Sequence, residues 1–429
     1  MRKLLITIIA VAFSFCGTAE AVAGSATIKQ CQDAARANYP LIKRYDLIRL
    51  TADCDVDNIA KGWLPQVSAT AQATVQSAVS ALPDVLSSVM QQMDTDARGL
   101  SRFQYKIGVD VAQTIYEGGV MRNRKAVDRL QADVETAQTD VNIYNVYARV
   151  NELYFGVLLL DERLRINHEM QTLLSANLDK LRVMLRDGVA MECDVNSLDA
   201  QLREARRDES EMRSSRTALL SILSVFCGIS IDNVEKPQPV EAQGYGEKRP
   251  EMELFNSQLR LADARESLLD AMLKPRVSAF ASGYYGYMGY DMFRDMFHRN
   301  PTLNGMVGIK VTWTIGNLYT RKNDKAKLQL QRQLTENSRE VFLFNTALDK
   351  LNSQAGIDKY RKLMADDEAI VGLREKVRRA AESKLRHGII DVNGLLQELT
   401  RENEARIQQS LHEVKMLKEM YDMKTVTNE

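Results

Sequence analysis

The sequence has no excess charge of either sign, because 57 lysines and arginines balance 57 aspartates and glutamates. A neutral chain lacks the basic surface that attracts nucleic acid, so nucleic acid is not an expected partner. Aromatic residues are scarce, at 7% of the chain, whereas charged residues make up 27%. This composition is too apolar for a disordered chain and unusual for a compact enzyme core.

Signals of catalysis are also missing. The histidines have no metal-ligand spacing, and there is neither a nucleophile elbow nor a phosphate-binding glycine loop. We therefore expect no enzyme activity, no metal and no cofactor. Beyond the N-terminus no apolar run reaches the roughly 18 residues of a transmembrane helix, so this chain could cross a membrane only with β-strands.

The N-terminus has the features of a removed signal peptide, residues 1–23. Arg2 and Lys3 precede an apolar run, 4–15, that is too short to span a bilayer, and small residues follow it. Cys16 follows Phe15, which fits a lipidation site poorly. The mature chain is thus expected in an oxidising compartment, with four cysteines: Cys31, Cys54, Cys193 and Cys227.

These cysteines are expected to be free buried thiols. Cys31 and Cys54 lie in one predicted helix, where a rise of 1.5 Å per residue separates them by ~35 Å.

The chain is internally duplicated with an offset of 200 residues. Residues that recur at this offset include Gly108, Val111, Thr114, Asn123, Lys125, Leu130, Leu185 and Gly188. A constant offset over such a span is hard to attribute to chance. Residues 24–236 form the first repeat and 248–429 the second, and the proline- and glycine-rich segment 237–247 is the linker.

The sequence pattern of each repeat predicts a helix, two strands, a very long helix, a turn and a long return helix. No proline occurs between Pro83 and Pro237 or after Pro301. The predicted helices are 119–186, 194–226, 321–386 and 391–423. A helix of such length needs partner helices along its apolar stripe, so each pair is expected to form an antiparallel coiled-coil hairpin.

The predicted strands, 67–75, 106–115, 277–287 and 307–315, alternate apolar residues with small, polar or charged ones. In a soluble sandwich the polar face would meet water, whereas in a membrane barrel the apolar face meets lipid and the polar face a lumen. Asp110 and Lys310, at equivalent positions on the polar faces, would line or bridge that lumen. The segments 77–102 and 288–304 are expected to be extracellular loops.

Four strands cannot close a barrel, and open strand edges are not tolerated in lipid. Three subunits would supply twelve strands, so the membrane interpretation requires an oligomer. The fold class is therefore an α+β membrane protein with a 12-stranded trimeric barrel and a long α-helical tunnel. An aromatic girdle at the membrane surfaces would contain Trp63, Tyr284, Tyr285, Tyr287 and Trp313, although the tyrosines could instead form a hydrophobic patch under a loop.

The helix tips carry two further candidates in each repeat. Gly188 and Gly388 are expected to end the outgoing helices in a left-handed conformation. Asp194 and Asp391 are expected to cap the return helices. Threefold symmetry would also gather each aspartate into a ring of carboxylates at the narrow end of the tunnel, where it would attract cations.

Taken in order, these features resemble the TolC family of outer-membrane efflux proteins over essentially the whole mature chain. The resemblance rests on 38–40 (Asn-Tyr-Pro), the strand entries at Pro65 and Pro275, the junction 114–119, and the tips 188–195 and 388–392. It implies a homotrimer in outer-membrane lipid that extends into the periplasm. It further implies an efflux or type I secretion duct.

The resemblance also implies docking through the tips to a periplasmic adaptor (membrane fusion) protein bound to an inner-membrane transporter of RND or ABC type. The docking residues would be Gly188, Val189, Gly388 and Ile389. Five residues separate Gly188 from Asp194, but only two separate Gly388 from Asp391. Asymmetric docking and gating at the two tips are therefore expected. The alternative function is a periplasmic coiled-coil structural or adhesin protein with small soluble sheets.

Overall fold

A computed structural model describes residues 25–81, 83, 85, 87–89, 99–240 and 248–428. The expected signal peptide with Cys16, and residues 241–247 of the linker, lie outside these ranges. The described chain forms two compact units. The first unit contains residues 25–45, 137–254 and 337–428, and the second contains 46–136 and 255–336. Each unit therefore combines segments of both sequence repeats.

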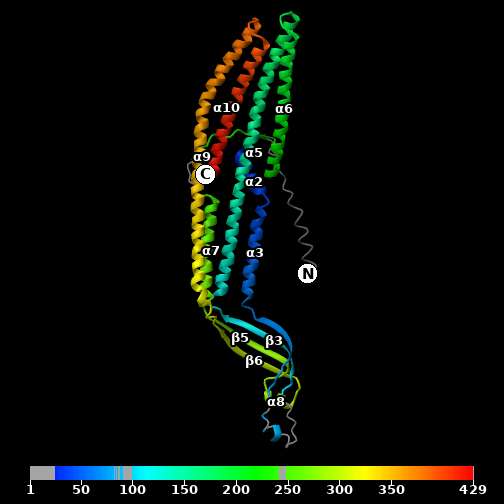
Figure 1. Cartoon of the computed structure of the whole chain (residues 1–429), viewed down its shortest axis with the longest axis vertical. Coiled ribbons are helices and arrows are strands. Elements are labelled where there is room, and N and C mark those ends of the chain that lie inside the picture. The colour runs from blue at the N-terminus through cyan, green and yellow to red at the C-terminus, as the bar shows by residue number, and fades with distance from the viewer. Residues whose placement is uncertain are drawn as a thin grey trace. The chain divides into compact units, whose positions relative to one another are not determined.

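The four long helices are present close to their predicted bounds (Figure 1). They are α5 (Val120–Arg186), α6 (Glu192–Cys227), α9 (Asn317–Arg386) and α10 (Val392–Thr427). With 67 residues and a rise of 1.5 Å per residue, α5 is about 100 Å long. The helices pair by burying leucines between them. In one cluster of the first unit, Leu174 and Leu178 of α5 pack with Leu198 of α6 and with Leu395 and Leu399 of α10.

The expected single helix before the first strand is interrupted. It consists of α2 (Ile28–Asn38) and α3 (Ile42–Lys61), and the break contains Tyr39 and Pro40. Proline disfavours helical geometry in the residue before it, and Tyr39 accordingly has extended backbone angles (φ −64°, ψ 129°). The prediction that Cys31 and Cys54 share one helix is therefore wrong. In the second repeat the corresponding helix, α7 (Pro250–Ala271), begins at Pro250, where the missing N–H is not needed.

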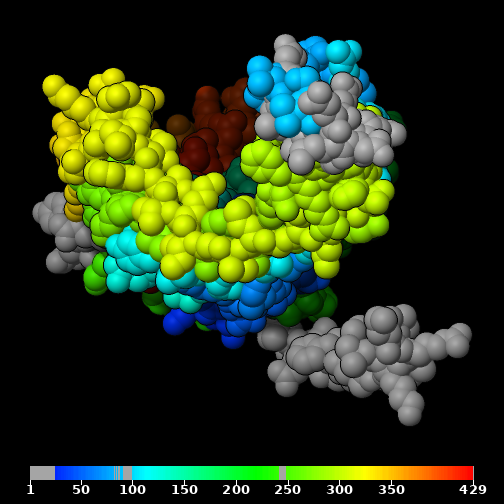
Figure 2. All heavy atoms as spheres, turned by 90° about the horizontal axis from the view of Figure 1, so that it is seen from below, coloured from blue at the N-terminus to red at the C-terminus, as the bar shows by residue number. Residues whose placement is uncertain are grey.

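The second unit holds one antiparallel sheet with strand order β2–β3–β5–β6. Its strands are β2 (Gln66–Val75), β3 (Phe103–Tyr116), β5 (Arg276–Tyr287) and β6 (Thr302–Thr312). The central pair, β3 and β5, joins the two repeats. In Figure 2 the blue-to-cyan residues of the first repeat lie directly against the yellow-green residues of the second.

Two features of this region differ from the sequence prediction. β6 ends at Thr312, so Trp313 and Ile315 lie outside the strand. The chain turns there, as the N–H of Leu318 bonds to the carbonyl of Ile315 at 2.9 Å, and α9 follows directly. The expected loop 288–304 contains a short helix, α8 (Met292–Phe297), because the Asp291 side chain accepts a hydrogen bond from the N–H of Arg294.

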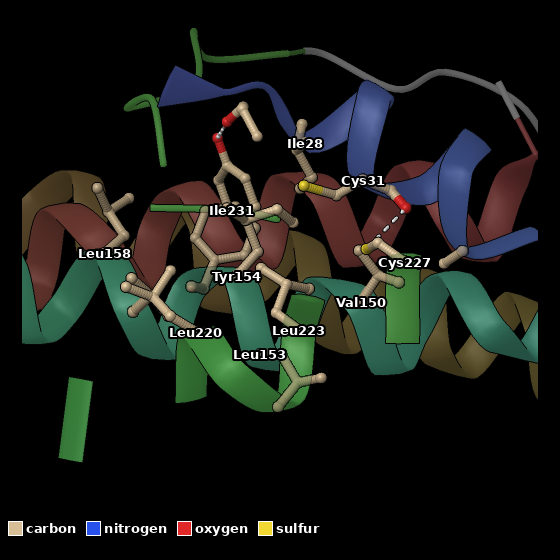
Figure 3. Close-up of a cluster of buried hydrophobic side chains, with 14 of the residues drawn as sticks. Ile28, Cys31, Val150, Leu153, Tyr154, Leu158, Leu220, Leu223, Cys227 and Ile231 are labelled. Atoms are coloured by element: carbon tan, nitrogen blue, oxygen red, sulfur yellow. Dashed lines mark hydrogen bonds between the residues drawn. The ribbon is translucent and has the colours of Figure 1, made fainter. Parts of the chain in front are cut away.

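A second cluster of buried residues in the first unit joins α2 to the α5–α6 hairpin (Figure 3). Nearby, β1 (Ser25–Ala26) pairs in parallel with β4 (Asn233–Val234). The Tyr154 hydroxyl, from α5, lies 3.0 Å from the Ala26 carbonyl and 2.5 Å from that of Glu235. One buried tyrosine thus ties the start of the described chain to the segment that follows α6.

Candidate functional site

The two helix tips have the same backbone geometry. Gly188 (φ +76°) and Gly388 (φ +68°) adopt the left-handed conformation predicted for them. The next residue closes the turn in both tips, since the N–H of Val189 bonds to the Met184 carbonyl at 2.8 Å and that of Ile389 to the Lys384 carbonyl at 2.9 Å. A Cβ added to either glycine would meet no described atom within 4 Å, so the backbone at both tips is open.

The expected difference in length between the two tips is wrong, whereas asymmetric docking and gating stay untested predictions without that support. Both outgoing helices end at equivalent residues, Arg186 and Arg386, and both return helices begin at residues 200 apart, Glu192 and Val392. Each tip therefore contains five residues, 187–191 and 387–391. The prediction treated Asp391 as the equivalent of Asp194, although the two residues are 197 rather than 200 positions apart. The structural equivalents are Met191 for Asp391 and Gly394 for Asp194.

The two aspartates consequently have different local roles. Asp391 is the N-cap of α10, and its Oδ1 accepts a hydrogen bond from the N–H of Gly394 at 2.9 Å, as predicted. Asp194 lies inside α6, where its Oδ2 accepts from the N–H of Met191 at 3.1 Å. The capping prediction for Asp194 was therefore inaccurate by one turn, because α6 begins two residues earlier than expected. Both carboxylates are next to the tips.

Strand register separates the sheet into a polar and an apolar face. Asp110 is opposite Ser282, and Lys310 is opposite Ser278. Because Ser278 and Ser282 are four residues apart on β5, alternation places Asp110 and Lys310 on the same face. The other face carries the aliphatic residues of all four strands, and eight of these are Val67, Ile107, Val109, Val111, Val277, Val307, Ile309 and Val311.

Most of the aliphatic side chains on this face are exposed. The exposed fraction is 81% for Val307 and 71% for Ile309 on β6, and 68% for Ile107 on β3. Burying such side chains is normally favourable, so a contiguous exposed set of them marks a surface that meets something other than water.

The aromatic residues do not all lie where a girdle requires. Trp63, Tyr285 and Trp313 are exposed. Tyr284, however, is on the polar face, next to Lys106, whose ammonium lies 5.8 Å from the ring centre. Tyr287 is buried, and its hydroxyl bonds to the Ser101 N–H and the Asp295 carbonyl. Tyr287 packs with Leu100 and Met296, as the loop-patch alternative expects, and the girdle stays a prediction for Trp63, Tyr285 and Trp313.

Sequence reasoning missed a buried ion pair between α9 and α10. The Arg378 side chain, 9% exposed, donates to Glu402, which is 3% exposed, at 2.5 Å. Arg378 also bonds to Glu382 at 2.7 Å, and Arg406 bonds to Glu402. The sequence does indicate that Glu402 is buried, because it continues the 3-4-3 spacing of a buried helix face that begins with Val392, Leu395 and Leu399. A glutamate in that series needs a cationic partner.

In the described ranges, no group of three or more His, Cys, Asp or Glu residues could hold a metal ion. None of the described helices combines the length and the apolar character needed to span a membrane.

The fold of the chain is similar to that of several solved outer-membrane proteins. VceC of Vibrio cholerae, an outer-membrane protein, is similar with a TM-score of 0.67 and 11% identity, over 93% of this chain and 95% of that chain. The CmeC outer-membrane channel of Campylobacter jejuni has a TM-score of 0.64 and 12% identity, over 93% and 85%. The open state of the Neisseria gonorrhoeae MtrE channel has a TM-score of 0.64 and 14% identity, over 93% and 88%.

No protein-family model and no curated protein matches this sequence. The chain has the fold of TolC-type outer-membrane channels, which confirms the resemblance inferred from the sequence at the level of the fold.

Proposed function

We propose that the chain is one subunit of a trimeric channel that spans the outer membrane, extends into the periplasm and acts as a passive duct for efflux or type I secretion. The observation that carries this proposal is the sheet of the second unit. It has an exposed aliphatic face, a polar face with Asp110 and Lys310, and two edge strands, β2 and β6, with no second strand partner among the described residues.

The strand order supports closure by identical copies. Neighbouring strands are antiparallel throughout, so β2 and β6 run in opposite directions. The β6 edge of one copy can therefore pair with the β2 edge of the next in the antiparallel sense. Closure removes the open edges that lipid does not tolerate, and three copies give twelve strands. The aliphatic face then meets lipid, and the polar face lines the lumen.

The helices carry a second surface suited to another copy. In the first unit, α9 exposes four apolar side chains in 3-4-3 spacing, the pattern of a coiled-coil seam: Val341, Phe344, Leu348 and Leu351. Phe344 and Leu351 are 64% and 66% exposed. Their equivalents on α5, Tyr144 and Asn151, are buried within the chain. Because these side chains are exposed on α9 but buried at the equivalent positions of α5, α9 is the helix proposed to contact a neighbouring subunit.

The tips are the proposed docking surface for a periplasmic adaptor, which would connect the duct to an inner-membrane transporter of RND or ABC type. Val189 and Ile389 are each 68% exposed, directly after the open glycine turns. Two apolar side chains on matching turns offer the adaptor two equivalent contacts per subunit. The neighbouring carboxylates, Asp194 and Asp391, would form rings of three in the trimer and favour cations at the tunnel end.

The test uses the full chain exported in a Gram-negative host. Heat-modifiable trimers in the outer-membrane fraction and single-channel conductance of the purified protein in planar bilayers are expected. A periplasmic monomer that needs no detergent would instead support a coiled-coil structural or adhesin role. Docking is tested by crosslinking from G188C and G388C, in a Cys54→Ser/Cys193→Ser background, to co-expressed adaptors. Capture at both tips is expected, and capture at neither, with normal trimers, would refute docking.

A further inference from the structure

Two cysteines from distant parts of the sequence meet in the core of the first unit (Figure 3). Cys31 lies on α2, and Cys227 is the last residue of α6. The Cys227 thiol donates a hydrogen bond to the carbonyl oxygen of Cys31, with a sulfur-to-oxygen distance of 3.4 Å. The exposed fractions of the two residues are 0% and 2%. The remaining mature cysteines, Cys54 and Cys193, are exposed, contrary to the expectation that all four are buried.

The two thiols also interact with each other, which makes them chemically unequal. The interaction with the Cys227 side chain lowers the pKa of the Cys31 thiol despite its burial. The same interaction, together with burial, raises the pKa of Cys227. In the packed structure Cys31 is therefore the more acidic of the two thiols.

Other contacts hold the same two segments together. The Asn38 side chain, at the end of α2, donates to the carbonyls of Val225 and Phe226 at 3.2 and 3.3 Å. Gly228 follows α6 in the left-handed conformation (φ +70°), and an added Cβ there would lie 2.5 Å from Asn38 Cγ. The backbones near both cysteines are thus held at close approach by contacts that do not involve sulfur.

We propose that Cys31 and Cys227 form a disulfide bond that fastens α2 to the C-terminal end of α6 in the exported protein. This inference rests on the proposed function, because an outer-membrane subunit matures in the periplasm, where thiols are oxidised. The bond would close a loop that contains β2, β3, all of α5 and all of α6. It would attach α2, near the start of the mature chain, covalently to the α5–α6 hairpin.

The chemistry is a thiol–disulfide exchange with a protein disulfide of the oxidoreductase class. Before docking either thiolate can attack first; with Cys31 as the first, it attacks one sulfur of the donor, forms a mixed disulfide and expels the first donor thiolate. Cys227 loses its proton and attacks the Cys31 sulfur, which releases the second donor thiolate. The two cysteines together lose two electrons and two protons, and the donor is reduced to a dithiol. Because both sulfurs are buried once α2 has docked, the exchange occurs before docking is complete.

The proposal is tested by counting the free thiols of the full chain in a Cys54→Ser/Cys193→Ser variant, which retains only the proposed pair. Protein from the host envelope is denatured and alkylated before and after reduction, and its mass is measured. No alkylation is expected without reduction, two adducts are expected after it, and digestion should yield a peptide pair linked through Cys31 and Cys227. A Cys31→Ser version of this variant is the matched control, with one adduct in both conditions.

A second arm separates this inference from the proposed function. The same purified variant is refolded in a glutathione redox buffer, which does not depend on cellular location, while membrane fractionation of the cells reports on the trimer. Trimers in the outer membrane whose two thiols alkylate without reduction would overturn the disulfide and leave the channel intact. A disulfide formed on refolding, in a protein that cells do not place in the outer membrane, would support the pair and overturn the channel. Free thiols after refolding overturn the disulfide wherever the protein resides.

Discussion

A charge placed at Val307 should prevent assembly if the aliphatic face of the sheet meets lipid. Val307 is at the centre of β6, with five strand residues on either side, and is 81% exposed in the single subunit. At ~3.3 Å per residue, a lysine there would be about 16 Å of strand from either end, beyond the reach of its own side chain. Val307→Lys is therefore predicted to cost about 2–4 kcal/mol per chain, or ~6–12 kcal/mol for a closed trimer.

The adjacent residue provides a matched control. Met306 lies opposite Ser282, on the polar face with Asp110 and Lys310, and is 47% exposed. Met306→Lys adds the same charge to the same strand but directs it toward the proposed lumen, so it should assemble like the unmodified protein.

The assay is the yield of heat-modifiable trimer in the outer-membrane fraction, together with the denaturant midpoint of the purified trimer. Val307→Lys should lose most of its trimer, whereas Met306→Lys should retain it. Equal, near-normal yields for both variants would show that water meets both faces and would refute the lipid-facing assignment. Equal loss in both would show that the defect follows charge itself rather than the face that carries it.

Three further predictions concern the helices. Arg378→Ala should lower the free energy of unfolding by about 3 kcal/mol in denaturant titrations, because it removes the buried cation beside Glu402 and leaves that carboxylate only the more exposed Arg406; the exposed neighbour variant Arg379→Ala should cost less than about 1 kcal/mol, and equal costs would contradict this account. Burial raises the pKa of Tyr144 to about 12 in the folded protein, whereas the unfolded chain has the ordinary value of about 10. The contribution of the neutral Tyr144 hydroxyl to the free energy of unfolding is therefore complete below pH ~10 and should be lost as pH rises from about 10 to 12. The difference in stability between the unmodified protein and Tyr144→Phe should therefore fall by roughly 2–3 kcal/mol over that range, and a pH-independent difference would refute the shift. Gly188→Ala and Gly388→Ala should each destabilise their tip by about 1–2 kcal/mol, equally by hydrogen exchange, and a clearly larger effect at one tip would contradict the equivalence of the turns.

The sequence was sufficient to predict what local pattern determines. The absence of proline between Pro83 and Pro237 predicted α5 and α6 within two residues at each end. Alternation predicted the four strands and the shared face of Asp110 and Lys310. Periodicity succeeds here because each helix or strand repeats one simple rule over many residues.

The failures occurred where a single residue or a distant contact decides the structure. Asp391 is the N-cap of α10, whereas Asp194 lies in the first turn of α6, and the sequence alone does not distinguish these two positions. Treating the two aspartates as equivalent therefore made the second tip three residues too short in the prediction. The contact between Cys31 and Cys227 joins residues 196 positions apart, and no local pattern reports it. Tyr287 looked like its neighbour Tyr285 in the sequence, but its hydroxyl bonds to Asp295, in α8, which the loop prediction had omitted.

The way the repeats combine explains why a duplicated chain does not split into two modules. Each repeat contributes only two strands to the four-stranded sheet, and a two-stranded hairpin is marginal by itself. The long register of β3 on β5, from Tyr105 to Tyr116, makes one sheet from both repeats. In the first unit, α10 of the second repeat shares its buried leucines with α5 and α6 of the first. Because both units take their cores from both repeats, a cut in the linker should yield fragments that fold only together, and each alone should expose the surfaces that the other covers.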